Sequence, residues 1–405
     1  MSLQWASRPL GEVCTVRPPK AEAEKRVGPH GTVSFVPMED LGIGAKTFRA
    51  TKTAMLSEVS GSYTYFADGD VLLAKITPCF ENGKLGVASG LVSGIGFGSS
   101  EFLVIRPSGE LDKDFLYYWL SRDAFRREGS ARMGGAVGQQ RVPRQFVESA
   151  PIPVPPLSEQ RRIVAILDRA FEGIAAARAN AEGSLANTRR TFQAARDRVF
   201  RQVPARWHVV RLGDVAATQY GLSEGMNDEN KGYRIFRMGE VQDGRLVDTG
   251  RMRCADVSPA EFEKYRLRGG DILFNRTNSF ELVGKTGIFE LDGDYCFASY
   301  LVRVLPDRGR LIPRFMNYLM NSDRFQRSVK SKASRSINQA NINASILRNE
   351  QVWFPPSLDE QSEIAASLGA ISMGMRRLEI IYRRKLAALD ELKQSLLHQA
   401  FSGNL

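Results

Sequence analysis

The segment PPLSEQRRI at residues 155–163 recurs as PPSLDEQSEI at residues 355–364, and this repeated phrase decides the fold. In both places a proline pair ends a strand-rich region, and a Ser or Asp close to a Glu follows, which is the pattern that opens a helix. We therefore expect one long helix to begin near Ser158. We expect a second long helix after the second phrase, with Asp359 as its N-cap.

Apolar and small residues follow each phrase at alternating steps of four and three, which is the spacing of a coiled-coil seam. The same additional step of four occurs at the same place in both segments, so the two helices share one phase with one stutter. Each helix would have roughly 45 residues and a length of about 65 Å, which is too long for stability without a partner. The expected seams are Ile163, Leu167, Ala170, Ile174, Ala177, Ala181, Leu185, Thr188, Phe192, Ala195 and Val199, and Ile364, Leu368, Ile371, Met375, Leu378, Tyr382, Leu386, Leu389, Lys393, Leu396 and Ala400.

A second apolar stripe lies off these seams, at Val164, Phe171, Ile380, Ile381 and Leu397. Two interpretations of it stay open. The stripe could bind another protein, or it could pack against the globular domains of the same chain.

The rest of the chain repeats with the same spacing of about 200 residues. Seven matches in one order indicate that a whole unit is duplicated. Among them, GDVLLAKIT at 69–77 returns as GDILFNRTN at 270–278, and EFLVIRP at 101–107 aligns with YLVRVLP at 300–306. The short β-rich runs favour an α+β domain in each copy, with one amphipathic helix near residues 112–127 and its equivalent near 312–331.

We therefore predict an α+β fold with a pseudo-twofold internal repeat. Two globular domains of mixed α/β structure, with largely antiparallel strands, would be separated by two long antiparallel coiled-coil helices. The expected boundaries are 1–157 and 205–357 for the globular domains, and 158–204 and 358–405 for the helices.

Composition excludes several classes of protein. The 405 residues are 43% hydrophobic, which is typical of a folded chain, and carry a formal net charge of +11. The sequence lacks a secretory leader and any stretch of 18 apolar residues, so we expect a cytoplasmic protein with no membrane partner. Four scattered cysteines and three isolated histidines give no support for a disulfide framework or a metal site.

The positive charge is concentrated in two equivalent segments. Residues 324–348 hold six Arg and Lys and no acid, and residues 122–144 hold six Arg and two acids. Each segment leaves a helix and enters a polar loop, SARMGGAVGQQR at 130–141 or SKASRSINQANIN at 331–343. Because Arg and Lys neutralise phosphates, whereas Arg, Asn and Gln bond base edges, the recurrence favours DNA contact over an ordinary solvated face.

A second pair of loops follows equivalent strands, AKITPCFENGK at 74–84 and NRTNSFELVGK at 275–285. They mix cations with Thr, Asn and Glu, which suits base or phosphate contact, although a polar hairpin tip would look similar. Their sequences differ, so two such loops reading bases would read different half-sites. The candidate DNA-binding residues of the four loops are Lys75, Thr77, Glu81, Asn82, Lys84, Arg132, Gln139, Gln140, Arg141, Arg276, Asn278, Ser279, Lys285, Lys332, Arg335, Asn338 and Gln339.

Patterns that resemble catalytic motifs fail in detail. SFELVGKT at 279–286 ends like a phosphate-binding loop, but Ser279 replaces the first glycine and bulky residues fill the cradle. GIGFGS at 94–99 precedes a strand rather than a helix, which weakens a dinucleotide or S-adenosylmethionine interpretation. We expect no catalytic residue and no metal ligand in this chain.

The chain resembles the specificity subunits of type I restriction-modification systems over essentially its whole length. The resemblance rests on PIPVPPLSEQRRIVAILD at 151–168, FPPSLDEQSEIAASL at 354–368 and LKQSLLHQAFSG at 392–403, and on the loops described above. It also rests on the duplicated layout, which is more specific than any one motif. Lys393, which stands where the first helix has Phe192, is a small departure that puts only local packing in doubt.

The resemblance implies a non-catalytic subunit with two target-recognition domains, each reading one half of a split double-stranded DNA site. It also implies partners: two adenine-N6 methyltransferase subunits that bind S-adenosylmethionine, and restriction/translocase subunits that use ATP and Mg. The expected location is the bacterial or archaeal cytoplasm, in association with the nucleoid. A stand-alone enzyme acting on nucleic acid and a coiled-coil adaptor without DNA binding remain as alternatives.

Overall fold

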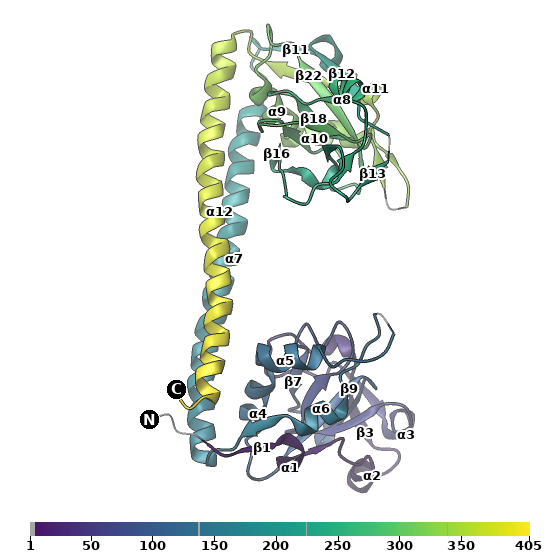
Figure 1. The fold of residues 1–405 in the computed structure, drawn as a ribbon, viewed down its shortest axis with the longest axis vertical. Helices are drawn as coiled ribbons and strands as arrows, with labels where there is room; N and C mark the ends of the chain where they lie inside the picture. Colours follow the sequence, from purple (N-terminus) through teal and green to yellow (C-terminus); the bar gives the residue numbers. More distant parts are fainter. Residues whose placement is uncertain (1–4, 137, 224, 338) are drawn as a thin grey trace. The chain divides into compact units, whose positions relative to one another are not determined.

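The computed structural model describes residues 5–136, 138–223, 225–337 and 339–405. The chain forms two compact units: unit 1 comprises residues 1–182 and 383–405, and unit 2 comprises residues 183–382. Two long helices, α7 (Leu157–Arg201) and α12 (Leu358–Phe401), each contribute one part to either unit (Figure 1). The division into four segments made from the sequence therefore remains a prediction, whereas the two long helices lie where the repeated phrases place them.

Unit 1 contains two four-stranded sheets, of order β2-β9-β6-β7 and β4-β3-β8-β5. Their pairings are antiparallel except for the parallel pair β3–β8, in agreement with the predicted strand arrangement. A separate antiparallel pair, β1–β10, joins the start of the domain to the segment before α7. The strands are β1 (Ser7–Pro9), β2 (Cys14–Val16), β3 (Thr32–Val36), β4 (Lys52–Met55), β5 (Thr64–Ala67), β6 (Val71–Ala74), β7 (Leu85–Val87), β8 (Ile95–Gly98), β9 (Phe102–Pro107) and β10 (Pro151–Pro153).

Unit 2 repeats this arrangement and extends it. The order β12-β22-β18-β20 matches β2-β9-β6-β7, with β16 and β15 added at one edge, and the parallel pair β14–β21 matches β3–β8. A small third sheet of order β19-β24-β23 joins two loops. The strands are β11 (His208–Arg211), β12 (Ala216–Tyr220), β13 (Met226–Asn227), β14 (Tyr233–Phe236), β15 (Val241–Gln242), β16 (Gly244–Leu246), β17 (Cys254–Ala255), β18 (Ile272–Asn275), β19 (Thr277–Asn278), β20 (Thr286–Ile288), β21 (Tyr295–Phe297), β22 (Leu301–Pro306), β23 (Ser334–Arg335), β24 (Ala340–Asn341) and β25 (Gln351–Phe354).

The single helix predicted in each globular domain is two short helices. In unit 2 the break occurs at Ser322, whose hydroxyl accepts a hydrogen bond from the Phe325 amide and so starts a new helix. A side-chain cap that satisfies a free amide favours a helix start over continuation. The short helices are α1 (Leu10–Val13), α2 (Ala21–Val27), α3 (Leu56–Val59), α4 (Lys113–Leu120), α5 (Asp123–Ser130), α6 (Arg144–Ser149), α8 (Pro259–Tyr265), α9 (Pro313–Met320), α10 (Asp323–Ser331) and α11 (Ala344–Arg348), with 3-10 turns η1 (Met38–Asp40), η2 (Val92–Gly94), η3 (Leu212–Asp214) and η4 (Met238–Glu240).

A buried glutamine explains why the phrase that opens each long helix is repeated. Gln160 accepts a hydrogen bond from the Asp112 amide at 2.7 Å and donates to the carbonyls of Glu110 and Pro155, both at 2.8 Å. Gln361 accepts from the Ile312 amide and donates to the carbonyls of Arg310 and Pro355, each at 2.9 Å. The same side chain therefore ties the linker and the following helix to the start of α4 in unit 1 and of α9 in unit 2.

The start of α12 differs in one detail from the prediction. The Ser357 hydroxyl, not the Asp359 carboxylate, accepts a hydrogen bond from the Glu360 amide, at 3.3 Å. Asp359 lies inside the first turn, where its negative charge faces the positive end of the helix dipole.

The long helices run antiparallel within each unit. In unit 1 Arg178 pairs with Asp390 at 2.5 Å, and Arg162 donates to the carbonyl of Leu405 at 2.7 Å. In unit 2 Arg189 pairs with Glu379 at 2.6 Å, and Arg206, just beyond α7, pairs with Glu360 at 2.8 Å. In both units a later position on one helix thus meets an earlier position on the other.

The seam predicted for α7 is buried or half-buried at every position, but the α12 seam is wrong at two positions. Ile371 and Leu378 are exposed, and the neighbouring Ser372 and Glu379 are buried instead. Glu379 is turned inward because it pairs with Arg189, and an ion pair of this kind carries no apolar periodicity that a sequence pattern could detect.

Each unit has a core that includes the adjoining helix ends. In unit 1 the sheets and short helices pack with Ile163 and Leu167 of α7 and Ala400 of α12. In unit 2 they pack with Phe200 of α7 and Leu368 of α12. Because each fully buried aliphatic or aromatic side chain contributes about 1.5–3 kcal/mol, these contacts anchor the helix ends to the domains.

Candidate nucleic-acid interface

The two predicted loops of unit 1 lie side by side although about 60 residues separate them in sequence. The Thr77 amide donates to the Gln140 carbonyl and the Val142 amide donates to the Lys75 carbonyl, both at 2.9 Å. Arg141 forms antiparallel bridges with Ile76 and with Gly134. The loop after β6 and the loop after α5 therefore form one continuous surface.

Unit 2 joins its two loops in the same way. Thr277 and Asn278 pair with Asn341 and Ala340, and the Ile342 amide donates to the Arg276 carbonyl at 2.9 Å. The Asn341 amide group also donates to the Thr277 hydroxyl at 2.9 Å. The pairing of Ile76 with Arg141 thus corresponds to that of Thr277 with Asn341, so both units present the predicted loops at equivalent places.

Glu101 pairs with one of the two main cations of the unit 1 loops and lies close to the other. Arg141 donates to both carboxylate oxygens of Glu101, at 3.0 and 2.8 Å, and the Lys75 amine lies 3.9 Å from the same carboxylate. The hydrogen bond from Arg141 holds the pKa of Glu101 below its usual value, so the acid is ionised near neutrality. Burial lowers the pKa of Lys75, whose amine donates to the Ser100 carbonyl at 2.8 Å.

Glu101 was not among the residues predicted for this interface. The Glu101 side chain is only 22% exposed. Its place immediately before strand β9 gave no sign that loops 26 and 40 residues away would meet it.

The other unit 1 candidates differ in how freely they can reach a ligand. Asn82 and Gln139 are exposed, and Gln140 is half-buried. The Thr77 hydroxyl donates to Glu81 at 2.9 Å. The Lys84 amine donates to the Met38 carbonyl at 2.8 Å, and the exposed Arg132 lies 5.0 Å from the centre of the Phe146 ring.

In unit 2 the hairpin β23–β24 carries exposed candidates. Arg335 is exposed and stacks on the Phe280 ring at 3.7 Å, and Gln339 is exposed beside it. Ile337, at the tip of the hairpin, is 99% exposed and was not among the predicted residues. Asn338 lies outside the described residues.

Lys332 is a weaker candidate than its sequence position indicated. Its amine pairs with the carboxylate of Glu350, which is 1% exposed and also accepts a hydrogen bond from Ser328 at 2.7 Å. Removal of Lys332 would leave the buried Glu350 carboxylate without its cation, so Lys332 stabilises the fold. The pairing of these residues, 18 positions apart, has no signature in the sequence.

The remaining unit 2 candidates surround the base of the hairpin. Arg276 is half-buried, donates to the Ser299 carbonyl at 3.2 Å and lies 4.9 Å from the centre of the Tyr220 ring. The Asn278 side chain accepts a hydrogen bond from the Ser279 amide at 2.8 Å, and Lys285 is exposed. The first two cations of the strand-end loops, Lys75 and Arg276, are therefore held by backbone carbonyls at equivalent places.

The stripe predicted for partner docking divides into two groups. Val164 and Leu397 are buried in the core of unit 1, and Phe171 is half-buried against it, so these residues follow the interpretation of packing within the chain. Ile380 and Ile381 on α12 are 51% and 56% exposed and remain accessible.

Among the residues that the structure describes, no three His, Cys, Asp or Glu side chains are grouped so that they could hold a metal ion. No helix in the described part of the chain is long and apolar enough to cross a membrane.

Comparisons with known proteins agree with this arrangement. The family model for the type I restriction modification DNA specificity domain matches twice, at residues 3–181 and 204–376. The specificity subunit of the type I restriction enzyme EcoEI of Escherichia coli is 40% identical over 161 residues, which are 40% of this chain and 26% of the relative. The EcoKI specificity subunit of the same species is 25% identical over 324 residues, 75% of this chain and 68% of the relative.

The chain thus matches only about a quarter of the length of the EcoEI relative. Two solved structures show the same fold, both at 24% identity and with 100% of this chain covered. One is from a study of complex assembly and conformational transition of the type I R-M system, with a TM-score of 0.78 and 99% of that chain covered. The other is the HsdS subunit of Thermoanaerobacter tengcongensis, with a TM-score of 0.56 and 98% covered. Because the family model covers most of the sequence in two copies, the chain belongs to the type I restriction-modification DNA specificity family.

Proposed function

We propose that this chain is the non-catalytic DNA-specificity subunit of a type I restriction-modification complex. The observation that carries the proposal is the joining of two basic, Asn- and Gln-containing loops by equivalent backbone pairings in both units. Such a surface combines cations for phosphates with amide and guanidinium groups for base edges.

The two units read different halves of a split, asymmetric site in double-stranded DNA. Their loop frames are equivalent, but the exposed side chains include Gln139 and Arg141 in unit 1 and Arg335 and Gln339 in unit 2. Because base readout depends on donor and acceptor positions, the two half-sites differ in sequence. In this proposal residues 1–157 and 205–357 are the target-recognition domains.

The long helices, at residues 158–204 and 358–405, set the spacing of the half-sites and bind the other subunits. The partners are two adenine-N6 methyltransferase subunits, which carry S-adenosylmethionine, and restriction subunits, which use ATP and Mg. This chain holds none of these cofactors and works in the cytoplasm beside the nucleoid.

DNA binding measured at two salt concentrations tests the proposal. The complex of this chain with its methyltransferase subunits is titrated with a DNA that carries the methylated genomic site and with a scrambled DNA. We expect specific binding that weakens with salt, because each neutralised phosphate contributes a slope of about 0.9 in the logarithmic plot. Equal binding to both DNAs, or none, would indicate the adaptor alternative, and methylation or cleavage by the chain alone would indicate a stand-alone enzyme.

Docking of the methyltransferase subunits is tested at the exposed part of the apolar stripe. Ile380→Glu with Ile381→Glu places two charges where an apolar contact is proposed, so we expect assembly to be lost while the chain itself stays folded. Ser367→Glu, at another exposed position of α12, is the matched control. Unchanged co-purification of the double variant with the methyltransferase subunits would contradict this docking surface.

A further inference from the structure

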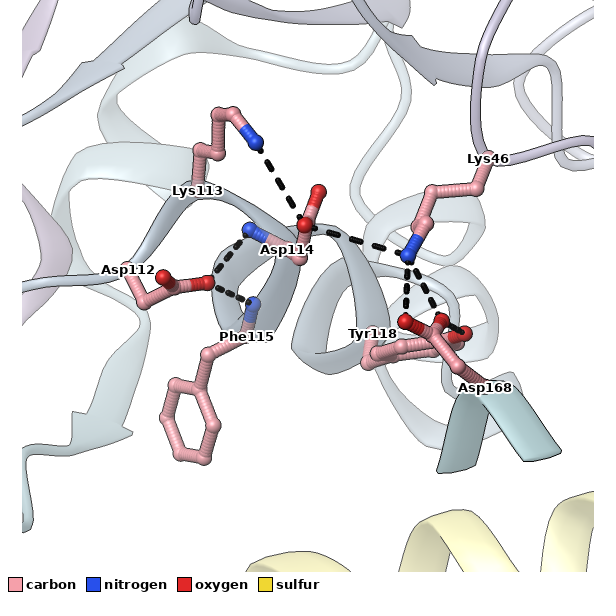
Figure 2. A network of polar contacts seen from close by, with 7 residues as sticks. All are labelled: Lys46, Asp112, Lys113, Asp114, Phe115, Tyr118 and Asp168. Atoms are coloured by element: carbon pink, nitrogen blue, oxygen red, sulfur yellow. Dashed lines mark hydrogen bonds and ion pairs between the residues drawn. The ribbon is translucent and has the colours of Figure 1, made fainter. Parts of the chain in front are cut away.

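A polar cluster joins the first globular domain to α7 within unit 1. The Lys46 amine lies 2.6 and 2.8 Å from the two carboxylate oxygens of Asp168 and 3.8 Å from Asp114 (Figure 2). The Tyr118 hydroxyl, on α4, donates to the same Asp168 carboxylate. One turn along α7, the Phe171 ring packs edge-on against the Tyr118 ring with centroids 5.3 Å apart.

The internal repeat identifies the corresponding positions in unit 2. Gln160 and Gln361 make the same three hydrogen bonds, which sets an offset of 201 residues between the starts of α7 and α12. Asp168 therefore corresponds to Gly369, and Phe171 corresponds to Ser372.

The sheet and α9 complete the correspondence. Thr47 pairs in parallel with Val87, and Arg245 pairs in parallel with Ile288, so Lys46 corresponds to Gly244. On the helix that follows the sheet, Tyr118 corresponds to Tyr318 and Asp114 to Arg314. Unit 2 has kept the tyrosine and lost the lysine, both carboxylates and the phenylalanine.

A pocket of about 360 Å³ is present in unit 2 where these side chains would be. Its walls come from β16, β20, α9 and α12, and its floor on α12 is made by small residues. A Cβ at position 369 would lie 3.8 Å from the Tyr318 hydroxyl oxygen, so the space where the first unit has a carboxylate is open. The lining includes Ala365, Ala366, Gly369, Ala370, Ser372 and Tyr318.

Ser372 stands where unit 1 has the Phe171 ring, and another aromatic side chain only partly takes the place of that ring. Phe192 of α7 contacts Tyr318 from the other helix, with centroids 6.2 Å apart, in the place that Lys393 takes in unit 1. In unit 1 the ring comes from the helix that follows the domain, whereas in unit 2 it comes from the opposite helix of the pair, so the side of Tyr318 that faces Gly369 remains uncovered by a ring.

The pocket wall carries more cations than anions. Arg245, Arg314 and Arg376 line it, against Asp243 and Glu290. Glu290 is paired with Arg314 and lies 4.0 Å from Arg245, and Arg376 donates to the Ser372 hydroxyl at 2.8 Å. Burial raises the pKa of Tyr318, so its hydroxyl stays protonated and able to donate near neutral pH.

We propose that this pocket binds a small organic carboxylate, in which a ring or short apolar group carries one carboxylate. The carboxylate takes the place of the Asp168 carboxylate, within reach of the Tyr318 hydroxyl and the arginines. The apolar group covers the small residues of α12, where Phe171 lies in the other unit. A volume of this size is typical of small-molecule sites, and the site does not depend on DNA binding.

Benzoate, benzyl alcohol and acetate separate the two parts of this ligand. The full-length chain without DNA is titrated with each compound by ligand-observed NMR. We expect saturable binding of benzoate, and at least about tenfold weaker binding of the alcohol and of acetate, because charge and ring each contribute part of the affinity. Benzyl alcohol binding as tightly as benzoate, or no saturable binding of benzoate, would overturn the proposal.

Rebuilding the unit 1 side chains supplies the matched variant. Gly369→Asp with Ser372→Phe fills the pocket with the chain's own carboxylate and ring, so benzoate binding is lost. The far-ultraviolet circular dichroism spectrum and thermal unfolding curve show that the variant is folded. Asp168→Gly with Phe171→Ser opens the equivalent place in unit 1 and leaves the unit 2 pocket intact, so one benzoate site must remain. Benzoate binding that persists in the filled variant would show that it occurs elsewhere.

The source of the carboxylate is distinguished by repeating the titration in the complex with the methyltransferase subunits. Unchanged benzoate binding there supports a free small molecule. Loss of binding in the complex, without added small molecule, would overturn that assignment, because a side chain of another subunit would then fill the pocket.

Discussion

At the scale of single residues, the exposed side chains of the β23–β24 hairpin are expected to act on one half-site only. Arg335→Ala or Gln339→Ala should weaken binding to that half-site by about 1–3 kcal/mol, since a well-placed bidentate base contact has that worth. Binding is measured on DNAs in which one half-site at a time is scrambled. Arg141→Ala and Gln139→Ala are the matched controls, and they should affect the other half-site. An equal loss at both half-sites would place the DNA on a different face.

Glu101 lowers the charge that unit 1 presents to DNA. Glu101→Gln removes a carboxylate that accepts two hydrogen bonds from Arg141 and lies near Lys75. We expect tighter binding of scrambled DNA at low salt, by about 0.5–1 kcal/mol, because Arg141 loses its carboxylate partner and the loops lose one negative charge. Salt-dependent titrations measure the change, and Glu290→Gln, an acid outside the loops, is the control. Weaker binding by the Glu101 variant would mean that the carboxylate itself contacts a base.

These residues also show what the sequence could and could not predict. The candidate loops were found because basic and amide residues recur at equivalent places in two copies. The partners of Lys332 and Arg141 were not found, because Glu350 and Glu101 reach them only through the fold. Ile337 was missed because an apolar residue in a polar loop is ordinarily expected to be covered.

At the scale of elements, the buried glutamine in the repeated phrase holds each long helix to its domain. Gln361→Met keeps the side-chain volume but leaves the Ile312 amide and the carbonyls of Arg310 and Pro355 without this partner. Unsatisfied buried groups of this kind lower the free energy of unfolding by roughly 2–5 kcal/mol in total. Hydrogen exchange should show the loss in unit 2 and not in unit 1.

Gln399→Met is the control for Gln361→Met, since Gln399 is exposed on α12 and its side chain donates only to Ser395. Equal destabilisation by the two variants would mean that the three hydrogen bonds of Gln361 contribute no more than a surface contact.

The sequence predicted the buried face of a helix correctly where apolar periodicity is strong. It predicted buried faces and helix boundaries incorrectly where polar side chains determine them. The α7 seam is inward throughout, but α12 turns Ser372 and Glu379 inward in place of Ile371 and Leu378. The helix predicted in unit 2 is two helices because the cap at Ser322 interrupts a continuous apolar pattern, and the helix predicted in unit 1 is also two. Lys393 of α12 stands where α7 has Phe192, and Ser372 of α12 stands where α7 has Phe171. The tyrosine of each unit therefore contacts one phenylalanine of α7, Phe171 in unit 1 and Phe192 in unit 2, which explains the one departure in the seam.

At the scale of the whole molecule, the proposal requires the long helices to determine the distance between the half-sites. Insertion of seven residues after Glu182 in α7 and seven after Tyr382 in α12 adds about 10.5 Å to each helix at 1.5 Å per residue. Seven residues are close to two helical turns, so the seam keeps its face. Since B-DNA rises about 3.4 Å per base pair, we expect the gap between the half-sites to grow by about three base pairs.

Sequencing of the adenines methylated by the reconstituted complex measures this gap directly. Both half-site sequences should stay unchanged, because the loops that read them are not altered. Insertion into α7 alone is the control: it shifts one seam against the other, and the pairs Arg178–Asp390 and Arg189–Glu379 cannot both form in their present register. A constant gap with both insertions, or altered half-sites, would show that something other than helix length determines the spacing.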